Sequence, residues 1–254
     1  MSLPASAGRA GERRLVSYTP HWDVLLEDPY PGILLNGLAT TLELALVSTA
    51  ASLVLGSLLA VGRASDSRLA RSACGGFCDL VRSLPGVFWL LAFFFCLPMI
   101  VPEQAGRALN GWDGFPFWAA AAGLSVNNAP YVADLLYAVM GQAGRGAMAS
   151  ARLSGLTGFS FWGRVALPQA YAASMPALSA RLLHNLKNTS LAMVISVPEL
   201  TWSSQEVESL SFAGLEATTA ATCIYAVLGL AFSLALMLVE RRLHRIARTE
   251  APRV

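Results

Sequence analysis

The stretch GAMASARLSGLTGFSFWGRVALPQ, residues 146–169, is the longest break in an otherwise membrane-like sequence. Gly155 and Gly158 divide it into short helical pieces, because glycine in a helix interior costs about 1 kcal/mol and readily takes the positive φ of a turn. Leu167-Pro168 then ends the turn and begins the next element, since proline fits the first turn of a helix but not its interior. A basic, amphipathic loop held in this way between membrane segments is a candidate docking site for a partner.

The composition places the chain among integral membrane proteins. Of its 254 residues, 55% are hydrophobic and only 13% are charged, and the mean hydropathy is +0.52. A soluble domain of this size carries roughly 25% charged residues. We therefore expect an all-α polytopic membrane protein, in which the placement of basic residues says more than the net charge of +2.

The apolar segments predict five membrane spans, because about 20 apolar residues cross the roughly 30 Å of hydrocarbon in a bilayer. They cover residues 33–61, 84–101, 115–140, 170–186 and 217–239. A further apolar run, residues 190–197, is too short to cross alone and is ended by Pro198. We divide the chain into a periplasmic or interfacial lead-in (1–31), a permease-like membrane domain (32–243) and a basic cytoplasmic tail (244–254). Residues 1–14 lack the apolar core of a signal peptide.

Basic residues predict the orientation, because lysine and arginine favour the cytoplasmic side of short loops. Arginines gather in the first connection, in the stretch 146–169 and in the tail, which therefore face the cytoplasm. Of the two opposite connections, one has Arg107 as its only basic residue. The other has no basic residue and contains four glutamates. This predicts an N-out, C-in protein, although three arginines at positions 9, 13 and 14 argue against an outer N-terminus.

A series of short motifs resembles the binding-protein-dependent ABC importer permeases. The central one is Ala149-Ser150-Ala151, three residues, Gly155, nine residues and Val165-Ala166-Leu167-Pro168, which resembles the EAA loop of that family. Further motifs, in an order and spacing similar to the polar amino-acid subfamily, are Asn36-Gly37 with Thr40-Thr41-Leu42, Arg82-Ser83-Leu84-Pro85, Tyr131-Val132-Ala133-Asp134, Leu186-Lys187-Asn188-Thr189-Ser190-Leu191 and Glu240-Arg241-Arg242.

The resemblance implies a MetI-like permease architecture in a bacterial inner membrane. In such importers two permease subunits form the path through the lipid, a periplasmic binding protein delivers the substrate, and each EAA loop seats in a cytoplasmic ATPase. The chain has no phosphate-loop motif, so ATP and Mg²⁺ would be bound by the partner ATPase. We expect a non-catalytic subunit with no cofactor, no metal and no nucleic-acid partner. The ATPase-coupling residues would be Ala149, Ser150, Ala151, Gly155, Leu167 and Pro168.

One departure from the family pattern concerns the EAA loop itself. The acidic residue at its head is Ala149 here, and the glutamine two positions earlier is Ala147. An exposed contact from that acid is worth about 0–1 kcal/mol, and a buried one more. We hypothesise that the chain is half of a heterodimer whose partner carries the fuller motif. The alternative is a tolerated surface substitution in a loop still fixed by Gly155.

A second candidate site is the string Arg181, His184, Lys187, Asn188 and Thr189. A charge at the centre of a membrane segment costs at least about 2.5 kcal/mol, so it tends to face a polar cavity or a partner. Helical spacing places Arg181, His184 and Asn188 on one face, which Lys187 borders. The short run after Lys187 predicts a broken helix, and transporters bind substrates at such breaks. The alternatives are that Arg181 and Lys187 pair with Glu43 or Asp134, or extend to an interface.

The same string carries a substrate hypothesis. The family's usual aspartate between the lysine and the threonine is Asn188 here, which favours an anionic or neutral substrate side chain over a cationic one. This version is most similar to the glutamate/aspartate group, with neutral polar amino acids such as glutamine as the alternative. A different class, an ion-coupled secondary transporter, would normally carry an internal repeat and more spans.

Polar and small residues in the third predicted span have two interpretations. Asn127, Asn128 and Asp134 either line the path or hydrogen-bond neighbouring helices. The small-residue run 119–123 is interpreted as a site of close helix packing.

Overall fold

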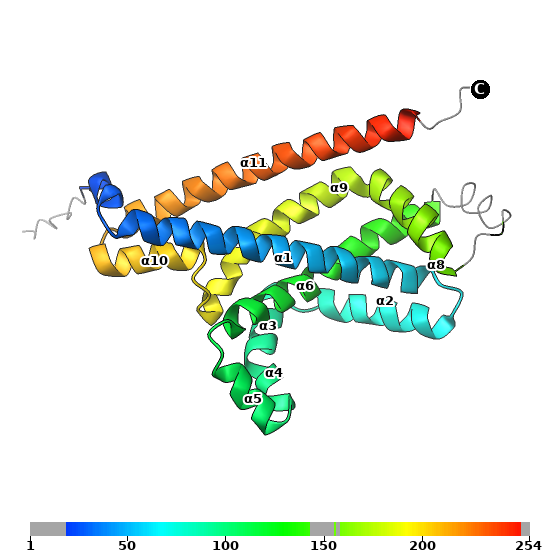
Figure 1. The fold of residues 1–254 in the computed structure, drawn as a ribbon, viewed down its shortest axis with the longest axis horizontal. Helices are drawn as coiled ribbons and strands as arrows, with labels where there is room; N and C mark the ends of the chain where they lie inside the picture. Colours follow the sequence, from blue (N-terminus) through cyan, green and yellow to red (C-terminus); the bar gives the residue numbers. More distant parts are fainter. Residues whose placement is uncertain (1–18, 143–154, 156–157, 250–254) are drawn as a thin grey trace, which may run out of the picture.

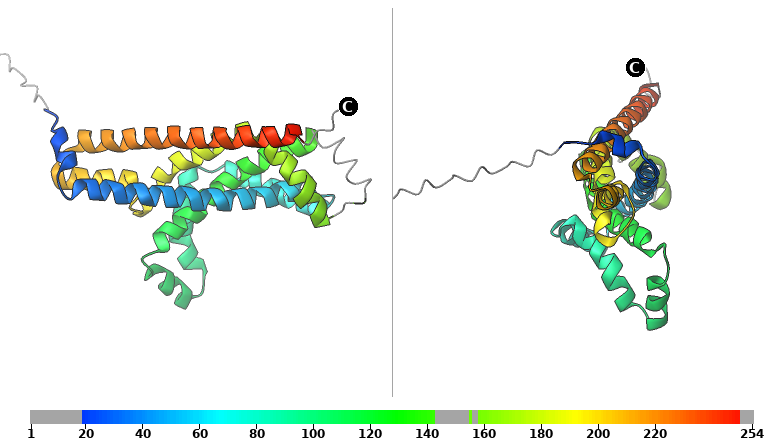
Figure 2. Two further views of the ribbon diagram at one scale, coloured as in Figure 1. Left: turned by 45° about the horizontal axis from the view of Figure 1, so that its top comes forward. Right: turned by 90° about the vertical axis from the view of Figure 1, so that its left-hand side faces the viewer.

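A computed structural model describes residues 19–142, 155 and 158–249, and these residues form α, 3₁₀ and π helices with no strand among them (Figure 1). The prediction of an all-α protein is confirmed for this part of the chain. Two long helices, α1 (Tyr30–Ala64) and α11 (Gly214–Thr249), run along the length of the molecule. A short helical arm, built from α3, α4 and α5, projects from one side of the bundle (Figure 2).

Helix α1 follows the short 3₁₀ segment Trp22–Leu26 and packs mainly against α6 (Phe115–Gln142). The two helices approach closely at Gly56, where an added Cβ would lie 2.6 Å from the side chain of Val132 and 2.9 Å from the carbonyl of Ala129. Glycine here removes the side chain that would otherwise separate the backbones. The opposite face of α1 exposes large apolar side chains, as expected of a helix in contact with lipid.

The first connection differs from the sequence-based prediction. Residues 68–82, expected to be part of a cytoplasmic loop, form helix α2 (Arg68–Arg82), which is capped by the Ser67 hydroxyl and packs on α1 and α6. Its direction then changes by 105° before the apolar pieces α3 (Gly86–Leu91), the π segment Ala92–Cys96 and α4 (Leu97–Ile100). The bend lies at Leu84-Pro85, because proline disfavours helical backbone in the preceding residue.

Helix α5 (Glu103–Asn110) leads into α6, whose bounds agree closely with the predicted third span. The small-residue run 119–123 packs against α3, as predicted: an added Cβ on Gly123 would lie 2.8 Å from the backbone of Leu90. Pro130 lies inside α6 without ending it.

Leu-Pro pairs follow both π segments of the described chain. In the arm, the π segment Ala92–Cys96 precedes Leu97-Pro98, and between α8 (Gly158–Phe161) and α9 (Leu167–Asn188) the π segment Trp162–Ala166 precedes Leu167-Pro168. Proline donates no hydrogen bond and crowds the carbonyl four residues earlier, so a locally widened turn accommodates it. Helix α9 begins at Leu167 as predicted, but the chain enters it through continuous helix rather than a stopped turn.

The break after α9 lies where the sequence predicts it. The α-helix ends at Asn188 and continues as the 3₁₀ segment Thr189–Ile195, which Ser196 ends in the left-handed conformation with φ 60°. The next helix, α10 (Leu200–Ser211), is capped by the fully buried carboxylate of Glu199, which accepts from the backbone N–H groups of residues 201 and 202 at 2.9 Å.

Two helices in the described part of the chain, α1 and residues 214–242 of α11, are long and apolar enough to cross a membrane, and the bent pair of α2 with residues 86–100 would make a third. The count of five spans stays a prediction. The end of α1, the start of α8 and the end of α11 lie at one end of the molecule, with α10 and the 3₁₀ segment before α1 at the other (Figure 1). The orientation across the membrane stays a prediction.

Candidate functional site

The exposed face of α9 carries three of the predicted binding residues. Arg181 is half-buried, whereas His184 and Lys187, one and two helical turns further on, are exposed. Small side chains continue the same exposed face towards the start of the helix, namely Ala173, Pro176, Ala177 and Ala180. His184 and Lys187 therefore lie on an exposed surface, and Arg181 lies at its edge, partly covered by α6.

Arg181 meets only neutral partners among the described residues. Its Nε donates to the Oδ1 of Asn128 at 2.5 Å, and its guanidinium carbon lies 3.7 Å from the centroid of the Tyr131 ring. Both partners come from α6. The predicted alternative, an ion pair with Glu43 or Asp134, is not formed in the described structure: Glu43 is exposed on α1, and Asp134 is occupied elsewhere.

Asp134 holds two other arginines. Its carboxylate accepts from Arg63 at the end of α1 and from Arg82 at the end of α2, and Arg82 also bonds Asp79. The guanidinium of Arg63 stacks over the Tyr137 ring at 4.6 Å. This cluster joins three helices through opposite charges, so Asp134 is an internal tie between helices in this structure.

The last two residues of the predicted string differ in accessibility. Asn188 is half-buried at the end of α9. Thr189 is fully buried, and its hydroxyl donates to the carbonyl of Leu186 at 2.8 Å. The turn from α to 3₁₀ helix directs Thr189 inwards, away from the face that carries Lys187.

Hydroxyl groups of α1 form a polar layer with Asn128 and Asn185. Of these residues, only Asn128 was singled out from the sequence. Asn128 of α6 donates to Ser52 at 2.8 Å, and Asn185 of α9 donates to Ser48 at 2.9 Å and to Thr49 at 3.1 Å. Asn128 stands out in an apolar span, but Ser48 and Ser52 do not. The available signal is their spacing of four residues, which places two hydroxyls on one buried face.

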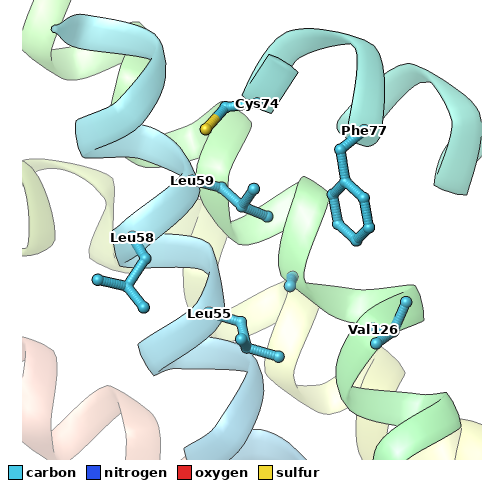
Figure 3. Close-up of a pocket in the computed structure, with 7 residues that line it drawn as sticks. Leu55, Leu58, Leu59, Cys74, Phe77 and Val126 are labelled. Carbon is cyan, nitrogen blue, oxygen red and sulfur yellow. The ribbon is translucent and has the colours of Figure 1, made fainter. Parts of the chain in front are cut away.

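The apolar pocket in Figure 3 does not suit an amino acid. It has a volume of about 280 Å³ and lies between α1, α2 and α6. Its lining residues are Leu55, Leu58, Leu59, Cys74, Phe77, Val126 and Ala129. A zwitterion there would lose its hydration without gaining hydrogen bonds, which is costly. We therefore place the candidate site on α9 rather than in this pocket.

The residues predicted to couple to the ATPase are only partly described. Ala149, Ser150 and Ala151 lie outside the described residues. Gly155 has φ 80°, a left-handed conformation that favours glycine, and no atom would contact an added Cβ. Leu167 is half-buried and packs against the α6–α9 core, whereas Pro168 is exposed. The described residues contain no group of three or more His, Cys, Asp or Glu side chains placed to hold a metal ion.

The described bundle has a broken helix, a basic group of side chains beside the break and an inner polar layer, features that membrane transport subunits commonly combine. Residues 52–245 match the family described as the binding-protein-dependent transport system inner membrane component. The chain belongs to this family and is a permease subunit of an amino-acid ABC importer, a class in which a separate subunit hydrolyses ATP.

Individual relatives share this class but differ in the substrate that they are named for. The glutamine permease GlnP of Escherichia coli K12 is 28% identical over 83% of this chain and 93% of its own length. The arginine permease ArtQ of Bacillus subtilis 168 is 27% identical over 85% of this chain and 94% of its own length. The crystal structure of an amino acid ABC transporter with histidines superposes with a TM-score of 0.72, at 24% identity, over 89% of this chain and all of that one.

Proposed function

We propose that the chain is one of two permease subunits of an importer for acidic amino acids, and that the α9 face from Arg181 to Lys187 receives the substrate's carboxylates. The observation that carries this proposal is the environment of Arg181, a half-buried arginine with neutral partners only among the described residues. A charge at membrane depth is costly unless it meets a polar cavity or a partner. The planar fork of a guanidinium matches a carboxylate, which would supply that partner.

The other basic groups on this face extend the argument from one carboxylate to two. His184 and Lys187 are exposed on the same side of α9, so an amino acid with two carboxylates meets more than one cation there. Lys187 also lies in the last turn before the helix changes to 3₁₀ geometry, and discontinuous helices are where transporters hold substrates. Thr189 is left out of the proposed site because its hydroxyl bonds its own helix.

Glutamine is the second candidate substrate. It is favoured by the named substrate of the permease GlnP and by the neutral side chain at Asn188. A glutamine would use the α-carboxylate for Arg181 and would not need a second cation.

The proposed assembly has a second permease, cytoplasmic ATPase subunits that bind ATP and Mg²⁺, and a periplasmic binding protein. The loop 146–169 docks the ATPase from the cytoplasm, with the N-terminus on the outer side. Because Ala149 replaces the family's acidic residue, we propose a heterodimer whose other permease carries the fuller loop. Full activity with this chain as the sole permease would refute the heterodimer.

Transport by the complete complex in proteoliposomes tests the substrate and the energy source together. We expect labelled glutamate uptake to be inhibited by excess unlabelled glutamate and aspartate, to require ATP and the ATPase, and to survive an ionophore. Preferential transport of arginine or histidine would refute the acidic substrate, and preferential transport of glutamine would select the second candidate. Uptake that collapses with the ionophore and ignores ATP would refute the importer class.

A further inference from the structure

The side chain of Asn128 has a fixed direction, set by the groups on either side of it. The Ser52 hydroxyl donates to the carbonyl of Thr49 at 2.9 Å, so towards Asn128 its oxygen acts as an acceptor. Only the amide nitrogen of Asn128 can satisfy that acceptor, and it does so at 2.8 Å. At the other end, the Nε of Arg181 can only donate and therefore requires the amide oxygen. Both ends demand the same orientation of the amide.

The result is a single-direction relay of hydrogen bonds across three helices. It runs from Arg181 of α9 to Asn128 of α6, then to Ser52 and the Thr49 carbonyl of α1. Every donor in the chain points the same way, an arrangement in which successive bonds polarise and strengthen each other. Ser52 and Asn128 are fully buried, so water does not compete at these two positions.

The relay leaves one part of the guanidinium free. Asn128 engages the Nε and the Tyr131 ring covers one planar face, while the two terminal nitrogens have no protein acceptor among the described residues. These two nitrogens form the edge that binds a carboxylate in a bidentate manner. Ala177, one turn before Arg181 on α9, and the adjacent Ala180 are exposed and small, so the α9 surface around Arg181 carries little side-chain bulk.

We propose that Ser52 and Asn128 are positioning residues for substrate binding: their relay holds the guanidinium of Arg181 with its two terminal nitrogens turned towards the substrate carboxylate. Neither residue touches the substrate. This inference rests on the proposed function, because it assumes that Arg181 binds the substrate. It goes beyond that function by assigning the orientation of Arg181 to a buried serine on a different helix.

A neighbouring pair of residues provides a matched control. Ser48 lies one turn before Ser52, is equally buried and accepts from Asn185, which also donates to Thr49. No arginine follows in that chain of bonds. A purely structural role predicts equal effects of Ser48→Ala and Ser52→Ala. A positioning role predicts that only Ser52→Ala changes substrate affinity.

The test is equilibrium binding of labelled glutamate and labelled glutamine to the purified permease–ATPase complex, with the binding protein omitted. We expect Ser52→Ala and Asn128→Ala to weaken binding of the better ligand about three- to tenfold. Asn128→Ala removes the charge-assisted hydrogen bond that orients the guanidinium, and Ser52→Ala removes the bond that holds the Asn128 amide. Asn128→Asp should weaken binding more, since a carboxylate there competes for Arg181. Ser48→Ala should bind like the wild type. Gel filtration and basal ATP hydrolysis check assembly for every variant.

The outcomes separate this inference from the proposed function. Wild-type binding by Arg181→Gln would remove Arg181 from the substrate site and refute the proposed site itself. If Arg181→Gln weakens binding while Ser52→Ala and Asn128→Asp do not, the relay is refuted and the site stands. Equal weakening by Ser48→Ala and Ser52→Ala would also refute the positioning role, because it would indicate a general loss of packing.

Discussion

Helix α6 holds two arginine clusters that differ in one respect, the charge of the acceptor it contributes. Asp134 neutralises Arg63 and Arg82 and ties the ends of α1 and α2 to α6. Asn128, nearly two turns earlier, offers Arg181 a neutral amide and leaves its charge uncompensated among the described residues. The first cluster pairs its arginines with carboxylates of the chain. In the second, the proposed function supplies the anion from the substrate.

Under the proposed function, the charge of the acceptor separates structural arginines from a substrate-binding arginine. A guanidinium that meets a carboxylate of its own chain contributes to the fold. A guanidinium that is held by neutral groups remains able to bind an anionic ligand. Its unpaired charge lowers the stability of the fold, because the site is weakly solvated. The following predictions test whether the two clusters differ in this way.

The largest effect on stability is expected from Asp134→Asn. This change leaves two arginines without a carboxylate and should lower the free energy of unfolding by about 2 kcal/mol, less than for a fully buried pair because the side chains are 19–32% exposed. Thermal melting of the purified complex in detergent measures it. The matched control is Glu103→Gln, which breaks a 78% exposed pair with Arg107 and should leave the melting temperature unchanged.

The same melting experiment on Arg181→Gln should give the opposite result. Removing an unpaired, half-buried charge relieves its desolvation penalty, which offsets the lost contacts with Asn128 and Tyr131, so we expect no net loss of stability. A drop as large as that of Asp134→Asn would show that both clusters are structural and would remove the difference between them.

A smaller effect is expected at Gly155, in the proposed coupling loop. Its φ of 80° costs a residue with a side chain about 1–2 kcal/mol, although an added Cβ meets no other atom. We expect Gly155→Val to reduce transport per ATP hydrolysed in proteoliposomes. Gly155→Asn, which tolerates the left-handed conformation better, is the control and should stay coupled. Normal coupling in Gly155→Val would take this residue out of the mechanism.

A modest loss of transport is expected from Lys187→Ala. An exposed ammonium contributes less than a held guanidinium, so uptake of glutamate should fall about three- to tenfold, equivalent to roughly 0.7–1.4 kcal/mol. Unchanged uptake with normal assembly would show that Lys187 is not a ligand, and His184→Ala gives a comparison on the same face.

Much of the fold follows from local patterns in the sequence, and the exceptions have physical reasons. The bounds of α6 and the break after Asn188 are encoded in runs of apolar residues and in Pro198. Helix α2 was predicted as a loop because the positive-inside rule counts arginines without asking whether they lie on a helix. Its bend at Leu84-Pro85 is encoded by the proline, whereas the packing of α2 on α1 and α6 is not specified by a single sequence.

The candidate site also combines features that local sequence patterns predict with features that depend on packing between helices. Helical spacing predicts Arg181, His184 and Asn188 on one face of α9, with Lys187 at its border. In the structure His184 and Lys187 are exposed, whereas Arg181 and Asn188 are half-buried. The relay through Asn128 and Ser52 could not be predicted, because it depends on the register between three helices that are far apart in the sequence. The burial of Thr189 depends on a change from α to 3₁₀ geometry that its own residue type does not indicate.

Uptake of labelled glutamate by proteoliposomes with the complete transporter, comparing the wild type with Arg181→Gln, tests the central claim most directly. A charge-assisted hydrogen bond is worth about 1.5–3 kcal/mol, so the account predicts a loss of about ten- to a hundredfold, with assembly and basal ATP hydrolysis intact. Uptake at the wild-type rate and with the wild-type KM would contradict it, because Arg181 would then have no role in receiving the substrate.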